Sequence, residues 1–416
     1  MRRGTLTAQA PGRLDVMGGI ADYSGADVLE LPLACCTRAV LQDTPGTRVE
    51  LRSKRESGWH EYACELSELS ASPAEVRGRF SELDRWAAYP VGVLYRCLQL
   101  GADPSRGFRL QIESTVPEGK GVASSAALEV ATMMVLAGHF DLELTPEQLA
   151  LECQWAENHI VGAPCGVMDQ LTAVLGHRDE LLALKCQPGG AVSYVDIPEG
   201  YRCYGIDSGL RHAVSGADYG TVRTAAFMGY RILDPAGNAG FLCNVAPEPD
   251  RLAALPERMT GADFLTRYGG ISDRATRVDP ARGYPVRAAT RHPIEEQQRV
   301  TRFTELLGLL PSHPEAAVQL GELMYAAHQS YSACGLGSPG TDRLVELVAE
   351  SGSERGLFGA RITGGGSGGT VAIFGRAAAE PLVRELAARY RSESGLGGEV
   401  FAASGPGAEQ SGVRKA

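Results

Sequence analysis

The chain has 416 residues, enough for two or three domains, and its hydrophobic fraction of 44% allows a sizeable buried core. Its formal net charge of −10 argues against a nucleic-acid partner, which would need a basic face. No stretch approaches the roughly 20 apolar residues of a membrane helix, and the N-terminus lacks the apolar core of a signal peptide. We therefore expect a cytoplasmic protein without nucleic-acid or membrane partners.

The first half of the chain predicts strands at Leu6–Ala10, Val49–Arg52 and Phe108–Ser114, followed by a run of helices. The strand at Phe108–Ser114 is indicated by clean alternation of apolar and polar residues. Helices are predicted at Ser124–His139, Pro146–Ile160 and Met168–Leu175.

The second half opens with a predicted strand at Tyr201–Ile206. Residues 234–293 are rich in Pro, Gly and Arg and indicate loops with short helices. Predicted helices follow at 300–310, 316–332, 342–351 and 377–391, with two short strands at 360–363 and 370–374. Because strands and helices mix without strict alternation, we predict an α+β fold in two lobes, residues 1–200 and 201–403, with a disordered tail at 404–416.

The first of two glycine-rich segments is Val116–Ala126, between a predicted strand and a long helix. Glycines let the backbone approach an anion, and the helix N-terminus supplies N–H donors and a positive dipole end. Ser124 or Ser125 is expected to cap that helix. The segment is not a Walker A loop, so it indicates either a phosphate cradle of another kind or an ordinary capped turn.

The second glycine-rich segment is Thr363–Thr370. It matches both a dinucleotide-binding pattern and the hydrolase pattern around Ser367, but both of those motifs require a following helix. A strand is predicted to follow instead, so both matches are rejected. A glycine run between two strands favours a flexible clamp over a ligand.

Four ordered segments together resemble the GHMP kinases, and in particular their galactokinase branch: residues 10–19, 116–126, 165–170 and 363–370. Within that branch the chain looks like the kinase module of the plant L-arabinokinases, through segments 17–25, 117–121, 207–212, 288–293 and 331–338. The resemblance implies a ribosomal-S5-like first lobe, a ferredoxin-like second lobe and an active site between them. It also implies ATP and Mg²⁺ as cofactors and a small-molecule sugar as substrate.

The resemblance assigns Asp169 as the catalytic aspartate and Arg13 as its neighbour near the γ-phosphate, where an arginine would keep the aspartate ionised. It assigns Ser125 and Glu157 to Mg²⁺, although Glu157 taken alone could be a solvated helix charge. It implies ATP contacts from both glycine-rich segments and one aromatic residue: Gly119, Lys120, Gly121, Ala123, Ser124, Ser125, Trp86, Gly365 and Gly366. Lys120 could equally be a solvated loop lysine, and an isolated Trp86 would more often be a core residue.

The resemblance places Asp22, Tyr219 and Gly166 on the sugar side, together with Gly19 and Ile20. Galactokinases carry Glu-His at the last two positions, and those side chains address C6 of the sugar. Ile20 is instead expected to fill the space of the missing CH₂OH of a pentose, which favours L-arabinose. Galactose or another sugar or uronic acid remains an alternative substrate, and a non-catalytic sugar sensor remains an alternative function.

Overall fold

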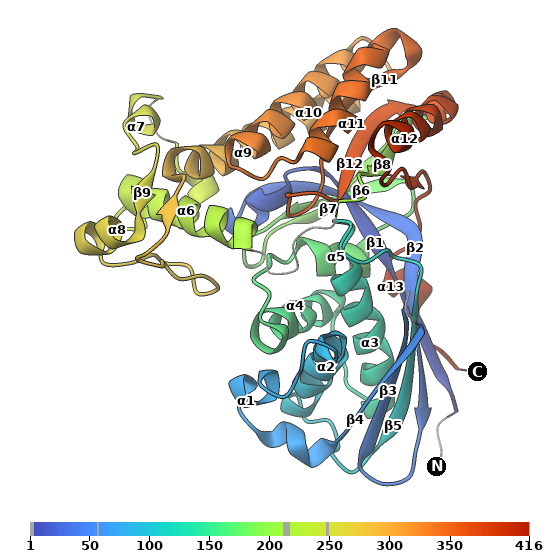
Figure 1. Cartoon of the computed structure of the whole chain (residues 1–416). Helices are drawn as coiled ribbons and strands as arrows, with labels where there is room; N and C mark the ends of the chain where they lie inside the picture. The colour runs from blue at the N-terminus through green and yellow to red at the C-terminus, as the bar shows by residue number, and fades with distance from the viewer. Residues whose placement is uncertain (1–3, 56–57, 211–216, 247–248, 416) are drawn as a thin grey trace.

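The protein folds into two lobes around two separate sheets, and a smaller arm extends to one side (Figure 1). The computed structural model describes residues 4–55, 58–210, 217–246 and 249–415. Within these ranges, none of the helices combines the length and the apolar character needed to cross a bilayer.

The first lobe is an eight-stranded sheet with helices packed on it. Its main path runs β14-β1-β2-β5-β3-β4, and β6 and β7 extend from β2. The strands are β1 (Leu6–Met17), β2 (Asp27–Asp43), β3 (Arg48–Arg55), β4 (Gly58–Glu65), β5 (Phe108–Ser114), β6 (Glu180–Lys185), β7 (Val192–Asp196) and β14 (Arg414–Lys415). The helices are α1 (Pro73–Arg77), α2 (Ala88–Gln99), α3 (Ser124–Phe140), α4 (Pro146–Ala156) and α5 (Met168–Leu175). Helices α3 and α5 contact β1 and β2, and the Arg13 N–H in β1 donates to the Val122 carbonyl just before α3.

The second lobe is a four-stranded antiparallel sheet in the order β11-β12-β8-β13. Its strands are β8 (Tyr201–Asp207), β11 (Leu357–Ile362), β12 (Thr370–Arg376) and β13 (Val400–Phe401). Taken in chain order, the four strands have the spatial order 2-3-1-4 of a ferredoxin-like sheet, which confirms the predicted α+β class. Helices α9 (Val286–Leu309), α10 (Ala316–Ala333), α11 (Pro339–Ser351) and α12 (Glu380–Ser394) complete the lobe.

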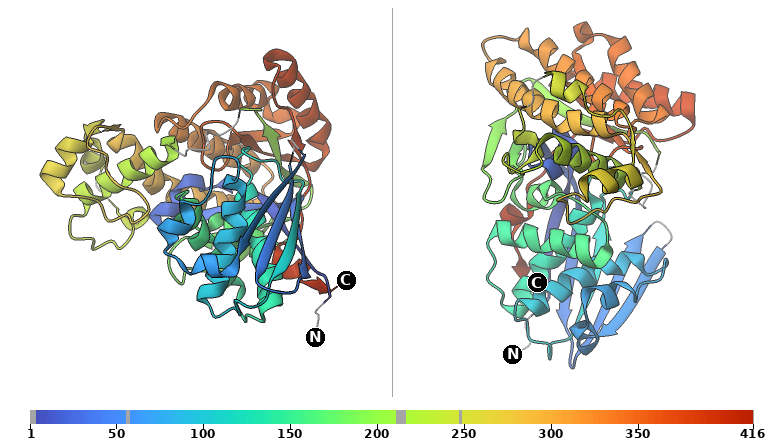
Figure 2. Two further views of the ribbon diagram at one scale, coloured as in Figure 1. Left: turned by 60° about the horizontal axis from the view of Figure 1, so that its bottom comes forward. Right: turned by 90° about the vertical axis from the view of Figure 1, so that its left-hand side faces the viewer.

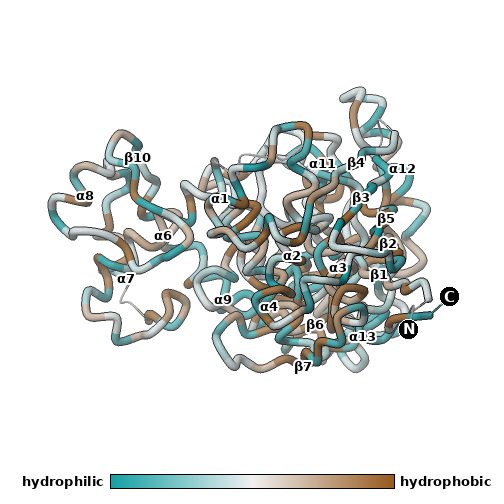
Figure 3. The backbone as a smooth tube through the Cα atoms, turned by 90° about the horizontal axis from the view of Figure 1, so that it is seen from below, coloured by the Kyte–Doolittle hydropathy of each residue, from teal (hydrophilic) through white to brown (hydrophobic). Residues whose placement is uncertain are grey.

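The arm is formed by α6 (Ala217–Leu233), α7 (Pro249–Ala253), β9 (Met259–Thr260), α8 (Gly261–Tyr268) and β10 (Gly283–Tyr284). It stands apart from the sheets in Figure 1 and in the left-hand view of Figure 2, and it contains hydrophobic residues of its own (Figure 3). The buried side chains of Phe264 and Tyr284 pack in one cluster with residues of α6 and α9, so the arm is anchored to the second lobe through those helices.

The C-terminal segment differs from its prediction. The main chain of Ser404 bridges to Leu33, the Gly407 N–H donates to the Gly176 carbonyl at 2.7 Å, and Ala408 is fully buried. Helix α13 (Ala408–Ser411) and β14 follow, and β14 pairs with β1. The prediction of a disordered tail at 404–416 is therefore wrong for the described residues, because its small residues permit close packing on the first lobe. The lobe boundary expected at residue 200 falls between β7 and β8.

Candidate active site between the lobes

The two glycine-rich segments, far apart in the sequence, lie against each other. The Thr370 hydroxyl donates to the Lys120 carbonyl oxygen at 2.8 Å. A Cβ added to Gly364, whose φ is +68°, would lie 2.8 Å from the Gly121 carbonyl oxygen. The second segment therefore closes over the first, as a clamp would, and only glycine allows this approach.

The first segment meets α3 differently from the prediction. The residue preceding the helix is Ala123, in a left-handed conformation with φ 56°, and no side chain caps the first turn. Ser124 and Ser125 are the first two helical residues, so the expected serine cap is wrong. The first-turn N–H groups consequently have no side-chain competitor, which leaves them available to an anion.

Arg13 and Asp169 form the centre of the site. A register shift between Pro11 and Arg13 in the β1–β2 pairing interrupts regular strand geometry at this point, a place where strands commonly re-aim a side chain. The Arg13 Nε donates to Asp169 Oδ1 at 2.9 Å, and its Nη2 lies 2.8 Å from the same oxygen. Arg13 is 3% exposed, whereas the Asp169 side chain is 21% exposed. The pair is thus fixed on the arginine side and open on the carboxylate side.

Two further contacts connect this pair to its surroundings. Arg13 Nη1 donates to the Gly121 carbonyl at 2.6 Å, and Arg13 Nε lies 3.3 Å from the fully buried carboxylate of Glu30. Burial opposes the charge of Arg13, but the nearby carboxylates, with Asp169 foremost, raise its pKa above the ordinary value. The guanidinium therefore stays charged and links the aspartate to the first glycine-rich segment.

Glu157 and Ser125 face each other beside Asp169. Glu157 begins a short π-helical turn (Glu157–Val161) after α4, and its buried carboxylate is hydrogen-bonded by the Ser125 hydroxyl. The Gln170 amide donates to Glu157 at 2.7 Å and to Glu129 at 3.1 Å. Burial, with repulsion from Asp169, raises the pKa of Glu157 to about 7. The alternative of a solvated helix charge is therefore wrong.

The arrangement around Glu157 suits a hard cation. One hydroxyl and one carboxylate lie together, with further negative charge nearby, and an added cation would relieve that repulsion. Within the residues described, no three or more His, Cys, Asp or Glu side chains gather as ligands around one ion would. Such a sparse set fits Mg²⁺, which usually keeps several waters and shares phosphate oxygens.

Asp22 lies next to the segment 165–170. It lies in the turn Gly19–Ser24, and a Cβ on Gly166 would fall 1.5 Å from Asp22 Oδ2. Burial and repulsion from Asp169 raise the pKa of Asp22 to about 7, while Arg223 and Arg13 oppose that rise. Tyr219 of α6 reaches the same turn, with its ring 5.9 Å from that of Tyr23 in an edge-to-face contact. Three of the five expected sugar-side residues are thus brought together.

Gly19 and Ile20 are placed differently. Gly19 has a φ of +52°, and a Cβ there would fall 1.8 Å from the Tyr331 hydroxyl oxygen. Ile20 is 1% exposed and packs with Tyr331 and Leu336 in the core of the second lobe. The Ile20 side chain is thus enclosed by its neighbours, and its expected place beside C6 of the sugar stays a prediction.

Four of the expected ATP contacts are buried or partly buried. The Lys120 ammonium forms an ion pair with the buried carboxylate of Asp207 in β8, so Lys120 is not a solvated loop lysine. Trp86, in the short turn Arg85–Ala87 before α2, is buried in the first-lobe core, as an isolated aromatic usually is. In the second glycine-rich segment Gly365 is half-buried, whereas Gly366 is buried against Leu336.

A buried charge cluster beside the site was missed by the sequence reasoning. Arg361 of β11 pairs with Asp15 of β1 at 3.0 Å, and both side chains are fully buried. Asp15 accepts from the N–H groups of Gly19 (3.0 Å) and Gly364 (3.2 Å). The Tyr331 hydroxyl donates to the Gly364 carbonyl at 3.0 Å. The one available signal was a lone arginine inside the apolar strand Leu357–Ile362.

Two family models match the chain: GHMP kinases N terminal domain over residues 88–177 and GHMP kinases C terminal over residues 314–392. The chain is 39% identical to L-arabinokinase of Arabidopsis thaliana over 97% of its own length and 46% of that protein, so it spans about half the length of that relative. It is 30% identical to galactokinase of Actinobacillus pleuropneumoniae, covering 94% of this chain and 90% of that protein.

Solved structures agree in fold. Lactococcus lactis galactokinase complexed with galactose superposes with a TM-score of 0.79 at 21% identity, covering 99% of this chain and 95% of that one. Methanococcus jannaschii mevalonate kinase gives 0.60 at 16% identity, covering 96% and 97%. The matching domains, the galactokinase relative and the two-lobed fold with its paired glycine-rich segments lead to one conclusion: this chain belongs to the GHMP kinases.

Proposed function

We propose that the chain is an ATP-dependent sugar 1-kinase that phosphorylates the anomeric hydroxyl of a free neutral sugar, with L-arabinose as the preferred substrate. The observation that carries this proposal is the Arg13–Asp169 pair, which lies where the two glycine-rich segments meet and keeps its carboxylate side accessible. Phosphoryl transfer asks a protein mainly for such positioning and charge stabilisation.

In the proposed reaction, Asp169 accepts the proton of the anomeric hydroxyl as the sugar oxygen bonds to the γ-phosphorus. The bond between that phosphorus and the bridging oxygen of ADP then breaks, and the electron pair stays on ADP. Arg13 holds Asp169 in place and ionised. Its contact with the Gly121 carbonyl fixes the position of the aspartate relative to the first glycine-rich segment. The uncapped first turn of α3 offers its N–H groups to the phosphates.

Ser125 and Glu157 are the residues proposed to hold Mg²⁺, which would neutralise charge on the nucleotide phosphates. Gln170 keeps the Glu157 carboxylate oriented toward this position. Lys120 is proposed to act on ATP indirectly, because its ion pair with Asp207 connects the first glycine-rich segment to the second lobe.

The charge balance favours a neutral sugar over a uronic acid. Asp22 and Glu157 are buried carboxylates, and the charge of Asp169 acts on both. Arg13 and Arg223 are the arginines acting on Asp22, and each is already paired with another carboxylate. The carboxylate of galacturonate or glucuronate would therefore meet net negative charge.

L-Arabinose is preferred over galactose for two reasons. The chain is 39% identical to L-arabinokinase, against 30% for galactokinase. Gly19 also has no room for a longer side chain, because Tyr331 occupies that position, so the glutamate of galactokinases has no counterpart here.

The test is ADP release from Mg·ATP with L-arabinose, D-galactose, D-galacturonate and D-glucuronate in parallel, with ³¹P NMR of the product. Faster turnover of L-arabinose to a sugar 1-phosphate is the expected result. Turnover of only a six-carbon sugar would overturn the arabinose preference, and sugar binding without any turnover would favour a sensor.

A further inference from the structure

The arm contributes a buried ion pair next to the sugar side of the site. Arg223 of α6 donates from Nε to Asp273 Oδ2 at 2.8 Å and from Nη2 to Asp273 Oδ1 at 2.9 Å. The two side chains are 9% and 5% exposed. Asp273 also accepts from the Thr276 hydroxyl at 2.7 Å and from the Ala275 N–H at 3.2 Å. Both carboxylate oxygens are thus occupied, and the guanidinium is held in one orientation.

One donor of this arginine is left over. Arg223 Nη1 is buried and has no hydrogen-bond partner, and the same holds for Asp22 Oδ1. Buried polar atoms are nearly always paired, so an unused donor and an unused acceptor in one region indicate a ligand group that bonds to both.

The surrounding contacts bring the two residues to the same place. Arg223 is among the charges that act on Asp22, and its Cζ lies 5.6 Å from the centre of the Tyr23 ring. Tyr219, one helical turn before Arg223, contacts the same ring edge-to-face. The Tyr219–Arg223 face of α6 therefore packs on the turn that carries Asp22.

We propose that Arg223 is a further specificity-determining residue of the sugar site: its free Nη1 donates to the sugar, and the free Oδ1 of Asp22 accepts from the same or an adjacent hydroxyl. Asp273 acts as its positioning residue and neutralises its charge, so that the pair recognises a hydroxyl rather than a carboxylate. This inference rests on the proposed function and gives the arm a role in it, as the wall that supplies Arg223 and its holder.

The experiment compares Arg223→Met, Arg223→Lys and Asp273→Asn with the unchanged chain, measuring KM for L-arabinose, KM for ATP and kcat. We expect Arg223→Met to raise the sugar KM at least about tenfold while the ATP KM stays within about twofold. Arg223→Lys keeps the charge but loses the bidentate guanidinium geometry, so a smaller rise in the sugar KM is expected. For Asp273→Asn the rise in the sugar KM should lie between those of the two Arg223 variants.

The matched control is Glu152→Gln, which alters the half-buried Arg96–Glu152 pair on the first-lobe helices, well away from the arm. It should leave both KM values within about twofold. Thermal unfolding checks that each variant is folded, and if Arg223→Met is not, the nearly isosteric Asp273→Asn decides. An unchanged sugar KM in a folded Arg223→Met or Asp273→Asn variant would overturn the inference.

The pH profile separates loss of the Arg223 charge from a loosened arm, because a loosened arm would expose Asp22 and lower its pKa. The charged groups that act on Asp22 are Asp169 of α5, Arg223 of α6 and Arg13 of β1. Loss of the positive charge in Arg223→Met raises the pKa of Asp22, so the acid limb of kcat/KM should move to higher pH. A limb that stays in place would contradict the assignment.

Sugar binding without ATP, measured by calorimetry with the same four sugars, separates the two proposals. If the unchanged chain binds a sugar without turning it over, the proposed function fails, while weaker binding by Arg223→Met still supports this inference. Equal binding by Arg223→Met would overturn it, and binding of none of the four sugars would overturn both.

Discussion

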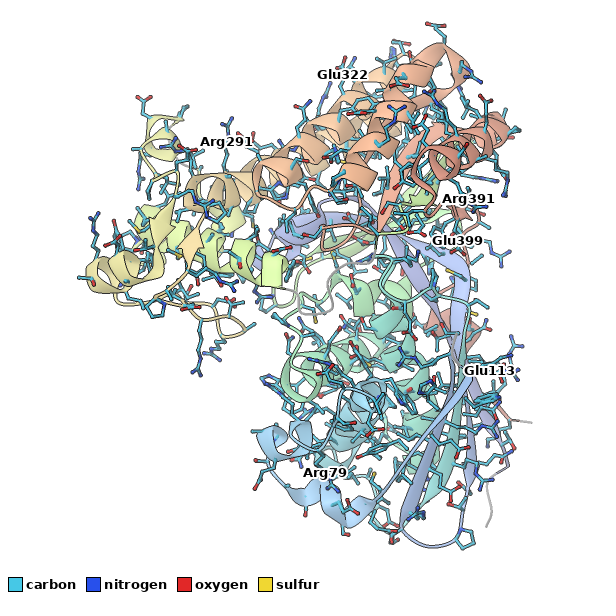
Figure 4. All side chains as sticks on the ribbon, in the orientation of Figure 1. Arg79, Glu113, Arg291, Glu322, Arg391 and Glu399 are labelled. Carbon is cyan, nitrogen blue, oxygen red and sulfur yellow. The ribbon has the colours of Figure 1, made fainter. Side chains whose placement is uncertain are left out.

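Arg13 and Arg361 are both buried arginines paired with an aspartate, but their surroundings differ. Carboxylates near each one outweigh burial and raise the arginine pKa. The partner of Arg13 is Asp169, 21% exposed, whereas the partner of Arg361 is Asp15, fully enclosed. Other charged side chains, such as those labelled in Figure 4, lie exposed at the periphery.

The difference shows how one chemical pair serves two purposes. The enclosed pair stabilises main-chain positions. Asp15 accepts hydrogen bonds from the N–H groups of Gly19 and Gly364, and so connects residues 15–19 to the second glycine-rich segment. The open pair holds a carboxylate that a substrate can reach. Substitutions in the first pair should therefore appear in stability, and those in the second pair in catalysis.

The largest expected effect is on turnover, from Asp169→Asn. Loss of a positioned general base typically lowers kcat by about 10²–10⁴-fold. Stability should fall less than it does for Arg361→Met, because Arg13 keeps the Glu30 carboxylate at 3.3 Å and the repulsion of Asp169 on Asp22 and Glu157 is removed. Steady-state kinetics and urea unfolding check the two parts, with the exposed Asp196→Asn as the control. A kcat within about tenfold of the unchanged chain would remove Asp169 from the catalytic role.

Arg361→Met should have the opposite signature. It leaves the enclosed Asp15 carboxylate without its cation, which costs about 3–5 kcal/mol of unfolding free energy. Arg343→Met, which breaks ion pairs of a partly exposed arginine, should barely move the urea midpoint. Equal midpoints for the two variants would mean that the enclosed pair is not structural.

Lys120→Met tests a pair of intermediate exposure. The Lys120 side chain is 18% exposed and its partner Asp207 is buried, so roughly 1–3 kcal/mol of stability should be lost. The KM for ATP should also rise, because the first glycine-rich segment loses its ion pair with β8. Lys54→Met, at an exposed position, is the control. A raised ATP KM without any loss of stability would instead point to direct phosphate contact.

The smallest effect is a pH dependence of stability. Folding raises the pKa of Asp22 to about 7, so the protonated form is favoured in the folded state. The resulting stability is fully present below the unfolded pKa and is lost as pH rises through about 7. Between about pH 6 and about pH 8 this group should cost about 1.4 kcal/mol, and Asp22→Asn should remove that part of the slope in urea unfolding. An unaltered slope would show that Asp22 does not titrate in this range.

Local pattern alone predicted several elements closely. The strand predicted at Phe108–Ser114 and the helix at Met168–Leu175 have those bounds in the structure. Alternation and helical periodicity are properties of neighbouring residues, so they can be seen in a single sequence. The strand at Asp27–Asp43 was missed, because its first part is buried on both faces and shows no alternation.

The ordered motifs and their spacing indicated the family and which residues would meet, including Arg13 with Asp169 and Asp22 with Gly166. Which side chains face open space, and which are enclosed, was decided only by tertiary packing. Ile20 and Trp86 became core residues, the tail joined the sheet through β14, and Arg361 and Arg223 found carboxylates far away in the sequence. Such pairings form between residues that are distant in the sequence, so they depend on the tertiary fold and cannot be predicted from the pattern of neighbouring residues.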